Sequence, residues 1–314
     1  MAKDNHNIGS FVWLDGKWLD YSSASIPLLG HSLHYGTAAW EGIRSYTSAA
    51  KEPLLFRAQD HFERLFYSMR LVGFQQPAYS INELCTRAWE LVQKNGFGDA
   101  YVRPIAFGDD RIFGMKMPPP FPARLAITTW KWDGYFAAQE GIASGLKVKI
   151  VSIRRLPQDS GLNRAKLSGP YLFSVLARQE ANQAGFDEAL LLDPQGFIAE
   201  GSGENVFIVR QGQLLTPEDG YVLPGITRKT VIQLAHDRRI PFAFARLTRA
   251  DLYTADEVFF TGTAAEIKAV LAVDQYPIGQ GKTGEITQQL QKDYGALVRG
   301  EKTDYSDWTF PKAA

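Results

Sequence analysis

The stretch Leu162-Asn163-Arg164-Ala165-Lys166-Leu167-Ser168-Gly169-Pro170-Tyr171 places one lysine just ahead of a predicted helix. Pro170 suits the first turn of a helix, and apolar residues recur at helical spacing after it. Gly185 is a typical helix stop. We therefore expect a helix over 171–184. Lys166 then lies at the mouth of this helix among small and apolar neighbours. An amine held out of bulk water there has a lowered pKa and can act as a nucleophile, whereas an ordinary solvated surface lysine is the alternative.

Length and composition allow two domains or one large α/β unit, because 314 residues exceed one small core. Lys plus Arg and Asp plus Glu both number 34, so we expect no binding to nucleic acid or to an anionic membrane. Cys85 is the only cysteine of the sequence, which excludes an internal disulfide, and we interpret it as a small buried residue on a helix. Residues 1–10 lack a signal-peptide pattern and no run is long enough to span a bilayer, so we expect a cytoplasmic protein.

The first part of the chain reads as short strands followed by amphipathic helices. The turn signal Asp15-Gly16 predicts a hairpin over residues 11–20. Apolar residues at spacings of three and four predict a helix after Arg57 and a second helix over 82–94. The Gly-, Met- and Pro-rich stretch 108–122 is predicted to be a loop and is a candidate lid or contact segment.

Two arginines in this part are candidates for anion binding. Alternation predicts a strand over 101–107 that puts Tyr101 and Arg103 on one face, where a half-buried guanidinium needs an anion. Arg57 could clamp a phosphate, or it could pair with Asp60 or Glu63.

His31 and His34 could bind a metal if they lie on a helix, because their spacing is three residues. Glu41 is the only carboxylate near them in sequence, and catalytic metals usually need three protein ligands. We therefore interpret both as polar loop histidines and expect no metal site.

An aromatic run, Trp130 to Tyr135, predicts the domain boundary after a strand over 124–129. We expect a small N-terminal domain over 1–129, a connector over 130–136 and a larger C-terminal domain over 137–314. Strands in the second half are predicted over 146–153, 188–193, 197–199 and 205–209.

Three more pieces can join the lysine in one site. Glu200 ends a strand beside two glycines, where its carboxylate could hold a protonated pyridine nitrogen. In 223–228, Pro-Gly precedes a helix predicted over 228–238 with Thr227 as its cap, and the free N–H groups of its first turn suit a phosphate. The stretch 260–266 is predicted to be a strand followed by a similar helix start. Plain helix capping is the alternative for both turns.

Taken together and in this order, these pieces resemble the fold-type IV pyridoxal-phosphate enzymes, specifically the branched-chain amino acid aminotransferases. The resemblance covers nearly the whole chain. It rests on HYGTAAWEGIR (34–44), LFRAQDHFERL (55–65), YVRP (101–104), NRAKLSGPY (163–171), IAEGSGENVF (198–207), LPGITR (223–228) and FTGTAAEI (260–267).

The resemblance implies an α/β (α+β) fold with a small N-terminal α/β domain and a larger C-terminal pseudo-barrel α/β domain. It implies that Lys166 is the catalytic residue and carries pyridoxal 5'-phosphate as a Schiff base, that Glu200 pairs with the pyridine nitrogen and that Tyr171 bonds the phenolic oxygen. The other implied cofactor-binding residues are Arg57, Leu223, Ile226, Thr227 and Thr263. The implied substrate-binding residues are Tyr35, Trp40, Tyr101, Arg103, Trp132, Tyr135, Thr263 and Ala264.

The implied activity is transfer of the amino group of L-leucine, L-isoleucine or L-valine to 2-oxoglutarate by a ping-pong mechanism, in a homodimer or larger homo-oligomer. A D-amino-acid or (R)-amine transaminase, an aminodeoxychorismate lyase and a non-catalytic metabolite-binding relative are the alternatives, and YVRP argues against the first three. Trp40 departs from the phenylalanine usual in the family, so the substrate range could be shifted. The loop 108–122 also departs from the family pattern, and no residue role is carried over to it.

Overall fold

The computed structural model describes residues 7–111, 114–116, 119–132 and 145–312. Contacts divide the chain into two units. The first comprises Met1–Asp133, Ala165–Gly169 and Ala296–Ala314, and the second comprises Gly134–Arg164 and Pro170–Gly295. The predicted domains, 1–129 and 137–314, are continuous in sequence, whereas these units are not. The predicted connector 130–136 lies partly outside the described residues.

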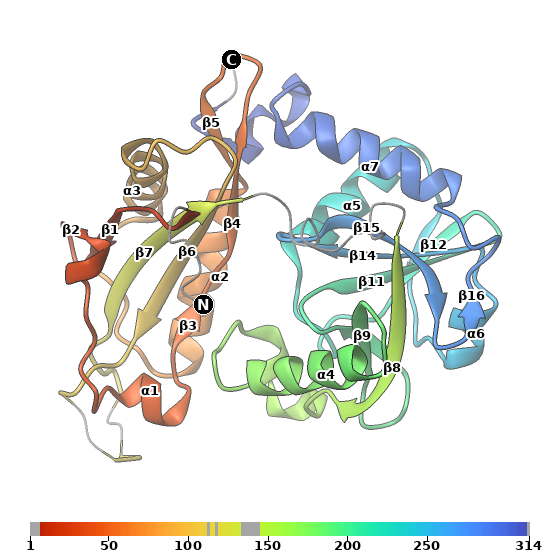
Figure 1. The fold of residues 1–314 in the computed structure, drawn as a ribbon, viewed down its shortest axis with the longest axis horizontal. Coiled ribbons are helices and arrows are strands. Elements are labelled where there is room, and N and C mark those ends of the chain that lie inside the picture. Colours follow the sequence, from red (N-terminus) through yellow and green to blue (C-terminus); the bar gives the residue numbers. More distant parts are fainter. Residues whose placement is uncertain (1–6, 112–113, 117–118, 133–144, 313–314) are drawn as a thin grey trace. The chain divides into compact units, whose positions relative to one another are not determined.

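The first unit is built on a mostly antiparallel sheet (Figure 1). Its strand order is β17-β5-β4-β6-β7-β1-β2, and β3 pairs with β6 beside β4. The strands are β1 Phe11–Leu14, β2 Lys17–Asp20, β3 Ala39–Trp40, β4 Ile43–Thr47, β5 Pro53–Phe56, β6 Ala100–Phe107, β7 Arg124–Lys131 and β17 Thr309–Phe310. Strands β1 and β2 form the hairpin predicted at Asp15-Gly16.

The described part of the first unit has one short α-helix and two longer ones, and the longer two are amphipathic because their apolar residues recur on one side. The three helices are α1 His31–Tyr35, α2 Ala58–Leu71 and α3 Ile81–Lys94. Helix α3 packs against α2 and against β1, β5 and β7. Ser80 begins α3 with a capping box to Glu83, and Cys85 on this helix is fully buried, as predicted.

The second unit contains a sheet that closes on itself. Neighbouring strands pair in the spatial order β10-β9-β8-β15-β14-β11. Strand β11 also pairs with β10, which closes the sheet into the predicted pseudo-barrel. The strands are β8 Leu146–Arg154, β9 Glu188–Leu192, β10 Ile198–Gly201, β11 Asn205–Arg210, β12 Gln213–Thr216, β13 Phe242–Phe244, β14 Glu257–Gly262, β15 Glu266–Val273 and β16 Tyr276–Pro277. The fold class is therefore the predicted one, α/β with a C-terminal pseudo-barrel.

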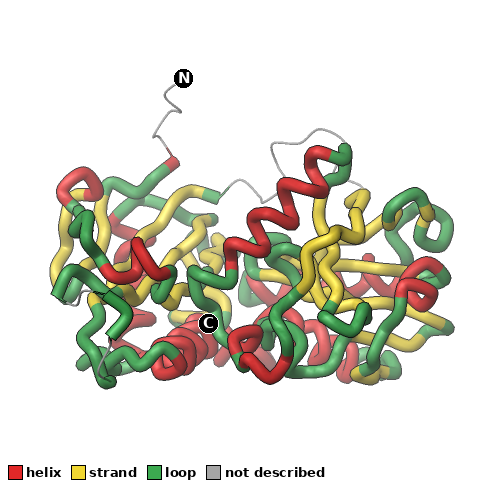
Figure 2. Tube along the Cα trace, turned by 90° about the horizontal axis from the view of Figure 1, so that it is seen from below, coloured by secondary structure: helices red, strands yellow, loops and turns green. Residues whose placement is uncertain are grey.

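Successive side chains along the barrel strands point to opposite sides of the sheet and pack into different clusters. Ile150 and Leu190 join an apolar core with Val206 and Phe260, while their neighbours such as Val151 pack with Ala177 of a covering helix. The helices that begin in this unit are α4 Tyr171–Gln183, α5 Ile226–Asp237, α6 Arg249–Tyr253 and α7 Glu285–Val298. Figure 2 shows the strands gathered within each unit.

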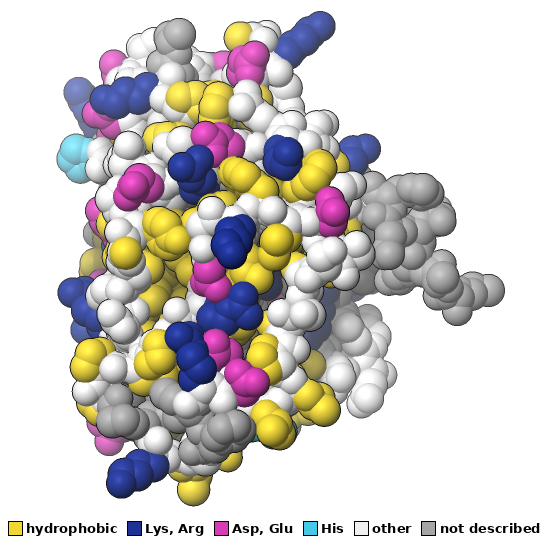
Figure 3. All heavy atoms as spheres, turned by 90° about the vertical axis from the view of Figure 1, so that its left-hand side faces the viewer, with side chains coloured by type: hydrophobic (Ala, Val, Ile, Leu, Met, Phe, Trp, Pro, Cys, Tyr) yellow, Lys and Arg dark blue, Asp and Glu magenta, His cyan; other side chains and the backbone are white. Residues whose placement is uncertain are grey.

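Acidic and basic side chains occur side by side on one face of the molecule (Figure 3). Figure 3 shows one face on which Lys and Arg side chains are interspersed with Asp, Glu and hydrophobic ones. Such a face lacks the one-sided charge that attracts nucleic acid. None of the described helices has both the length and the apolarity needed to cross a membrane.

Candidate active site

Backbone hydrogen bonds hold the lysine segment 165–169 like a strand in the first unit. Lys166 O accepts the Trp40 N–H at 3.0 Å, and the Ser168 N–H donates to Ala38 O at 2.8 Å. The Lys166 N–H donates to Ser68 Oγ of α2 at 3.0 Å. Lys166 therefore precedes α4, as expected. It lies on a paired segment that ends before Pro170, which is the N-cap of α4 and not its first helical residue.

The Lys166 side chain is 9% exposed, so it is not the solvated surface lysine of the alternative interpretation. Burial lowers the pKa of Lys166 to about 8, because removing water penalises the ammonium form, and the negative charge of Glu41 offsets this only in part. About a tenth of this amine is therefore neutral at pH 7, far more than for a solvated lysine. The prediction of a nucleophilic lysine has the electrostatic basis it requires.

A buried ion-pair network surrounds Glu41 in the same unit. Arg64 Nε donates to Glu41 Oε1 at 2.6 Å, and His61 Nδ1 lies 2.7 Å from Glu41 Oε2. Burial alone would raise the pKa of Glu41, but Arg64 and His61 outweigh it and hold that pKa far below its usual range. Sequence reasoning considered Glu41 only as a metal ligand. The polar residues His61, Arg64 and Ser68, spaced along one side of α2, were the signal it missed.

Aromatic rings surround the guanidinium of Arg103, which lies on β6. Its guanidinium carbon lies 4.1 Å from the centre of the Trp40 ring, 5.3 Å from that of Tyr101 and 5.4 Å from that of Trp130. Arg103 Nε is buried and has no hydrogen-bond partner among the described residues. Lys166 Nζ lies 4.1 Å from the centre of the Trp40 ring. The Arg103 guanidinium and the Lys166 amine thus both contact the indole of Trp40. The buried Nε–H of Arg103 is available to donate to an anion.

The remaining predicted substrate residues of this unit differ in their surroundings. Trp132 is half-buried and its ring lies 4.9 Å from that of Tyr101, centre to centre. Tyr35 on α1 is 47% exposed. Tyr135 lies outside the described residues. The structure therefore brings Trp40, Tyr101, Arg103, Trp132 and Lys166 together within the first unit.

Arg57 makes the ion pair that the sequence offered as one of two alternatives. Its Nη2 donates to Asp60 Oδ1 at 2.7 Å, and its Nε donates to Asp60 Oδ2 at 3.0 Å. Its guanidinium also stacks 4.4 Å from the centre of the Trp308 ring. These contacts fix its position, and a phosphate contact stays a proposal.

The histidines singled out in the sequence lie on helix α1 and not in a loop. His31 is buried, with Nδ1 3.0 Å from Thr37 Oγ1 and Nε2 3.1 Å from Gly114 O. His34 Nε2 lies 3.0 Å from Leu28 O. Both ring nitrogens of His31 therefore have protein partners.

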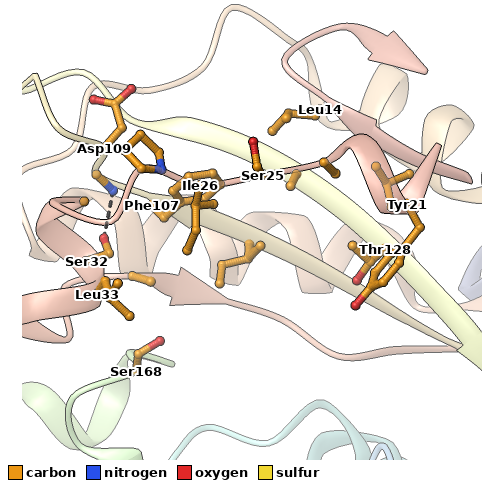
Figure 4. Close-up of a pocket in the computed structure, with 18 residues that line it drawn as sticks. Leu14, Tyr21, Ser25, Ile26, Ser32, Leu33, Phe107, Asp109, Thr128 and Ser168 are labelled. Atoms are coloured by element: carbon orange, nitrogen blue, oxygen red, sulfur yellow. Dashed lines mark hydrogen bonds between the residues drawn. The ribbon is translucent and has the colours of Figure 1, made fainter. Parts of the chain in front are cut away.

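In the first unit, a mostly apolar cavity of about 420 Å³ lies against strands β6 and β7. Figure 4 shows it between the α1 region, the strands and Ser168 of the lysine segment. Leu14, Ile26, Leu33 and Phe107 contribute to its lining. Lys166 and Arg103 do not line this cavity. The cavity is therefore distinct from the group of aromatic rings around Arg103.

In the second unit, Glu200 on β10 is buried, forms an ion pair with Arg155 and accepts hydrogen bonds from Asn205 and Leu223. Arg155 Nε lies 2.8 Å from Glu200 Oε1, while Asn205 Nδ2 and the Leu223 N–H donate to Oε2 at 3.1 Å each. Its exposed fraction is 5%. Donors of this kind stabilise the ionised carboxylate, which is the form needed to hold a protonated ring nitrogen.

The turn 223–225 leads directly into α5, which starts earlier than expected. The helix begins at Ile226 with Gly225 as N-cap, so Thr227 is a buried helical residue and not the cap. A Cβ on Gly225 would collide with Asn205 Oδ1, so a larger residue here would displace the amide that donates to Glu200. The first N–H groups of a helix have no acceptors within it and suit a phosphate.

The helix start expected in 260–266 is absent. Strand β14 ends at Gly262 and β15 begins at Glu266, so Thr263, Ala264 and Ala265 form the turn of a hairpin. The sequence prediction was wrong because small residues serve a tight turn as well as a helix N-terminus. Thr263 and Ala264 are half-buried there, and Tyr171 is the half-buried first residue of α4.

Each unit, taken by itself, supplies groups that suit pyridoxal 5'-phosphate. A buried amine of low pKa suits the aldehyde, a buried and well-donated carboxylate suits the pyridine nitrogen, and the glycine-capped start of α5 suits the phosphate. No cluster of three metal-ligating side chains occurs in the described ranges.

Comparisons with known proteins agree with this chemistry. A family model described as amino-transferase class IV matches residues 38–273. The branched-chain-amino-acid aminotransferase of Pseudomonas aeruginosa is 39% identical over 297 residues, which are 95% of this chain and 95% of that protein.

Solved structures resemble the chain over nearly its full length. One is the branched-chain amino acid aminotransferase of Escherichia coli, with a TM-score of 0.91, 36% identity and coverage of 96% of this chain and 98% of that one. Another is the branched-chain amino acid aminotransferase of Thermobaculum terrenum in its PLP-form, with a TM-score of 0.87, 31% identity and the same coverage. Fold and site together define a pyridoxal-phosphate-dependent transferase. More particularly, the chain belongs to the class IV aminotransferase family.

Proposed function

We propose that the chain is a branched-chain-amino-acid aminotransferase. It moves the amino group of L-leucine, L-isoleucine or L-valine to 2-oxoglutarate and forms the branched 2-oxo acid and L-glutamate. The observation that carries this proposal is the Arg103 guanidinium enclosed by Trp40, Tyr101 and Trp130 beside the buried Lys166 amine. Aromatic faces suit a branched apolar side chain, and the arginine suits the second carboxylate of glutamate.

The proposed roles follow from the surroundings of each side chain. Pyridoxal 5'-phosphate, when bound, supplies an electron sink for the charge that develops at the substrate Cα. Lys166 would hold the cofactor, and its neutral Nζ would accept the proton from the substrate Cα, a role that the lowered pKa of this amine favours. Glu200, ionised and fixed by Arg155 and Asn205, keeps the pyridine nitrogen protonated.

Other residues of the proposed site bind and orient. The N–H groups at the start of α5 and the Arg57 guanidinium bind the phosphate, and Tyr171 donates to the phenolic oxygen. Backbone N–H groups of Thr263 and Ala264 bind the α-carboxylate of the substrate. The proposed cofactor set is Arg57, Lys166, Tyr171, Glu200, Leu223, Ile226, Thr227 and Thr263, and the proposed substrate set is Tyr35, Trp40, Tyr101, Arg103, Trp132, Tyr135, Thr263 and Ala264.

Incubation of the protein with L-leucine and 2-oxoglutarate tests the proposal. We expect L-glutamate and 4-methyl-2-oxopentanoate in equal amounts, and none with Lys166→Ala. Turnover of D-alanine or (R)-1-phenylethylamine without turnover of L-leucine would replace the proposal with the alternative transaminase. Arg103→Ala should impair the half-reaction with 2-oxoglutarate far more than the half-reaction with leucine, because only the former needs a second cation.

We also propose that the chain works as a homodimer or larger homo-oligomer. Exposed leucines near α1 support this, since Leu28 is 81% exposed and Leu29 and Leu33 are each 57% exposed. Light scattering tests it: a solution mass equal to the 35.0 kDa of one chain would contradict it. The cytoplasmic location stays a prediction.

A further inference from the structure

Segment 303–310, which contains β17, lies beside Arg57 in the first unit. Strand β17 pairs antiparallel with β5, so that Thr309 lies opposite Phe56. Directly after β5, the Arg57 N–H donates to Trp308 O at 2.6 Å. The backbone of the segment is therefore fixed against the residue that we propose as a ligand of the phosphate.

Arg57 has a backbone conformation that few residues other than glycine adopt. Its φ is 52°, in the left-handed region, at the N-cap of α2. Its N–H is bonded to Trp308 O, and its own O accepts the His61 N–H at 3.2 Å. Residues in such conformations persist where the surrounding structure holds them, and they cluster at ligand-binding sites. Here Trp308 holds Arg57 on one side and α2 holds it on the other.

The guanidinium of Arg57 is held along one edge and across one face. Asp60 accepts from Nε at 3.0 Å and from Nη2 at 2.7 Å, which fixes the edge. The guanidinium carbon lies 4.4 Å from the centre of the Trp308 ring, and the Arg57 side chain is 9% exposed. A planar cation held in both ways has little freedom to turn, so it is oriented before a ligand arrives.

Two further aromatic rings pack against the indole of Trp308. The Tyr305 ring lies 4.5 Å from it, and the Phe56 ring lies 6.3 Å from it at an interplanar angle of 73°, centre to centre. Aromatic rings attract each other at these distances. The indole therefore has a defined position over Arg57 and can orient the guanidinium rather than follow it.

We propose that Trp308 is a positioning residue for the phosphate of pyridoxal 5'-phosphate. Its indole orients the Arg57 guanidinium and its backbone O fixes the Arg57 N–H, so the phosphate meets a cation that needs no reorientation. The inference rests on the proposed function, in which Arg57 binds the phosphate. A long side chain that becomes ordered only on binding loses conformational freedom, which lowers the affinity. Removal of the indole therefore weakens binding of the phosphate and leaves binding of the pyridine ring and the aldehyde unchanged.

Two aldehydes, one with the phosphate and one without it, test the proposal. Pyridoxal 5'-phosphate and pyridoxal are each titrated by absorbance into cofactor-free protein. Compared with the wild type, we expect Trp308→Leu to bind pyridoxal 5'-phosphate about five- to tenfold more weakly and pyridoxal equally well. Pyridoxal forms an internal hemiacetal, but this lowers its affinity equally for every variant. Equal losses for both aldehydes would show that the indole supports only the fold, and no loss for either would show that it does not orient Arg57. Both results overturn the proposal.

Three variants serve as controls. Trp308→Phe keeps a ring and should lose only about two- to threefold in affinity for pyridoxal 5'-phosphate. Trp18 is also a half-buried tryptophan of the first unit, on β2, and Trp18→Leu should match the wild type with both aldehydes. In an Arg57→Gln background, Trp308→Leu should cause no further loss, because the cation on which the indole acts is gone. Additive losses would contradict positioning through Arg57.

The outcomes separate this inference from the proposed function. Absence of pyridoxal 5'-phosphate binding by the wild type would overturn the proposed function. With wild-type binding intact, an unchanged affinity of Arg57→Gln for pyridoxal 5'-phosphate would overturn the inference alone. Backbone pairing of β17 with β5 does not use the indole, so we expect Trp308→Leu to fold. Should it fail to fold, Trp308→Phe decides: a loss confined to pyridoxal 5'-phosphate supports the proposal, and wild-type affinity or equal losses for both aldehydes refute it.

Discussion

Lys166 owes its proposed reactivity to burial, which gives its chemistry a definite pH dependence. Only the neutral amine attacks an aldehyde, and burial lowers the pKa of Lys166 to about 8 from an ordinary 10.5. The rate at which cofactor-free protein captures pyridoxal 5'-phosphate should therefore rise with pH and level off above about 8. Stopped-flow absorbance across this range measures it, with Lys166→Ala as the control that gives no stable product. A rate that climbs steadily to about pH 10 would point to a solvated lysine.

Trp40 contacts two cationic side chains, and the structure gives its indole a specific role. Its ring lies 4.1 Å from both the Arg103 guanidinium carbon and Lys166 Nζ. A cation over an aromatic ring contributes about 0.5 to 2 kcal/mol, and indole is the ring that attracts cations most strongly. Trp40→Phe should raise the KM for 2-oxoglutarate about two- to fivefold, and Trp40→Leu about tenfold, with smaller changes for leucine. Steady-state kinetics with both substrates measures this, and equal KM values for the two variants would exclude a cation–ring contribution.

Sequence reasoning at this scale identified the residues whose chemistry is distinctive and missed those that support them. Lys166 and Glu200 could be singled out because a lysine shortly before Gly-Pro and a carboxylate at a strand end followed by two nearby glycines are unusual in sequence. The pairing of Glu41 with His61 and Arg64 could not, because it joins residues about twenty positions apart through the packing of α2. Arg155, the partner of Glu200, was missed for the same reason.

Helix α2 supports the lysine segment through one hydroxyl. Ser68 Oγ accepts the Lys166 N–H at 3.0 Å and donates to Arg64 O at 2.9 Å. Ser68→Ala leaves a buried N–H without an acceptor, so we expect a loss of about 1 to 3 kcal/mol in the free energy of unfolding. Urea denaturation of the cofactor-free protein measures it.

A matched control for this prediction exists in the same unit. Ser45 is fully buried, and its Oγ has no hydrogen-bond partner among the described residues. Ser45→Ala should therefore leave the free energy of unfolding unchanged or raise it slightly. Equal losses for Ser45→Ala and Ser68→Ala would mean that the bond to Lys166 contributes nothing measurable.

The turn before α5 depends on a glycine because another side chain fills the space a Cβ needs. In Gly225→Ala the new methyl would meet Asn205 Oδ1 at 1.9 Å and displace the amide that donates to Glu200 and to Leu223 O. We expect the affinity for pyridoxal 5'-phosphate to fall by about tenfold or more. Gly203→Ala is the control, since nothing lies within 4 Å of its added Cβ. Equilibrium titration of both variants checks the contrast, which a normal affinity in Gly225→Ala would contradict.

Element boundaries were predicted where periodicity is long and failed where it is short. The fourteen-residue helices α2 and α3 and the strand β6 follow from repeated apolar spacing. The stretch 260–266 offered only Gly, Thr and Ala, which suit a hairpin turn and a helix start equally. The stretch forms a hairpin turn because β14 pairs with β15 on either side of it. No local pattern in the sequence predicts that pairing.

At the scale of the whole molecule, the sequence predicts two parts but not their composition. Segment 165–169 belongs by its contacts to the first unit, although the residues on both sides belong to the second. The cause is a bridge between Ala39 and Leu167, a contact across more than a hundred residues. Such long-range pairing is set by the global fold, which local spacing does not encode.

Cys85 offers a probe of the opening of the folded chain. It is fully buried on α3, and burial raises the pKa of its thiol to about 12, so native protein holds almost no reactive thiolate at neutral pH. We expect negligible labelling by a disulfide reagent in the native state and one labelled thiol per chain in denaturant. Because the proposed cofactor binds only the folded chain, a concentration of about 100 times its Kd should slow labelling about 100-fold, which corresponds to about 2.7 kcal/mol. Lys166→Ala should weaken this protection, since covalent capture is lost. Rapid labelling of the native protein, or a rate indifferent to pyridoxal 5'-phosphate, would show that α3 opens independently of the lysine segment.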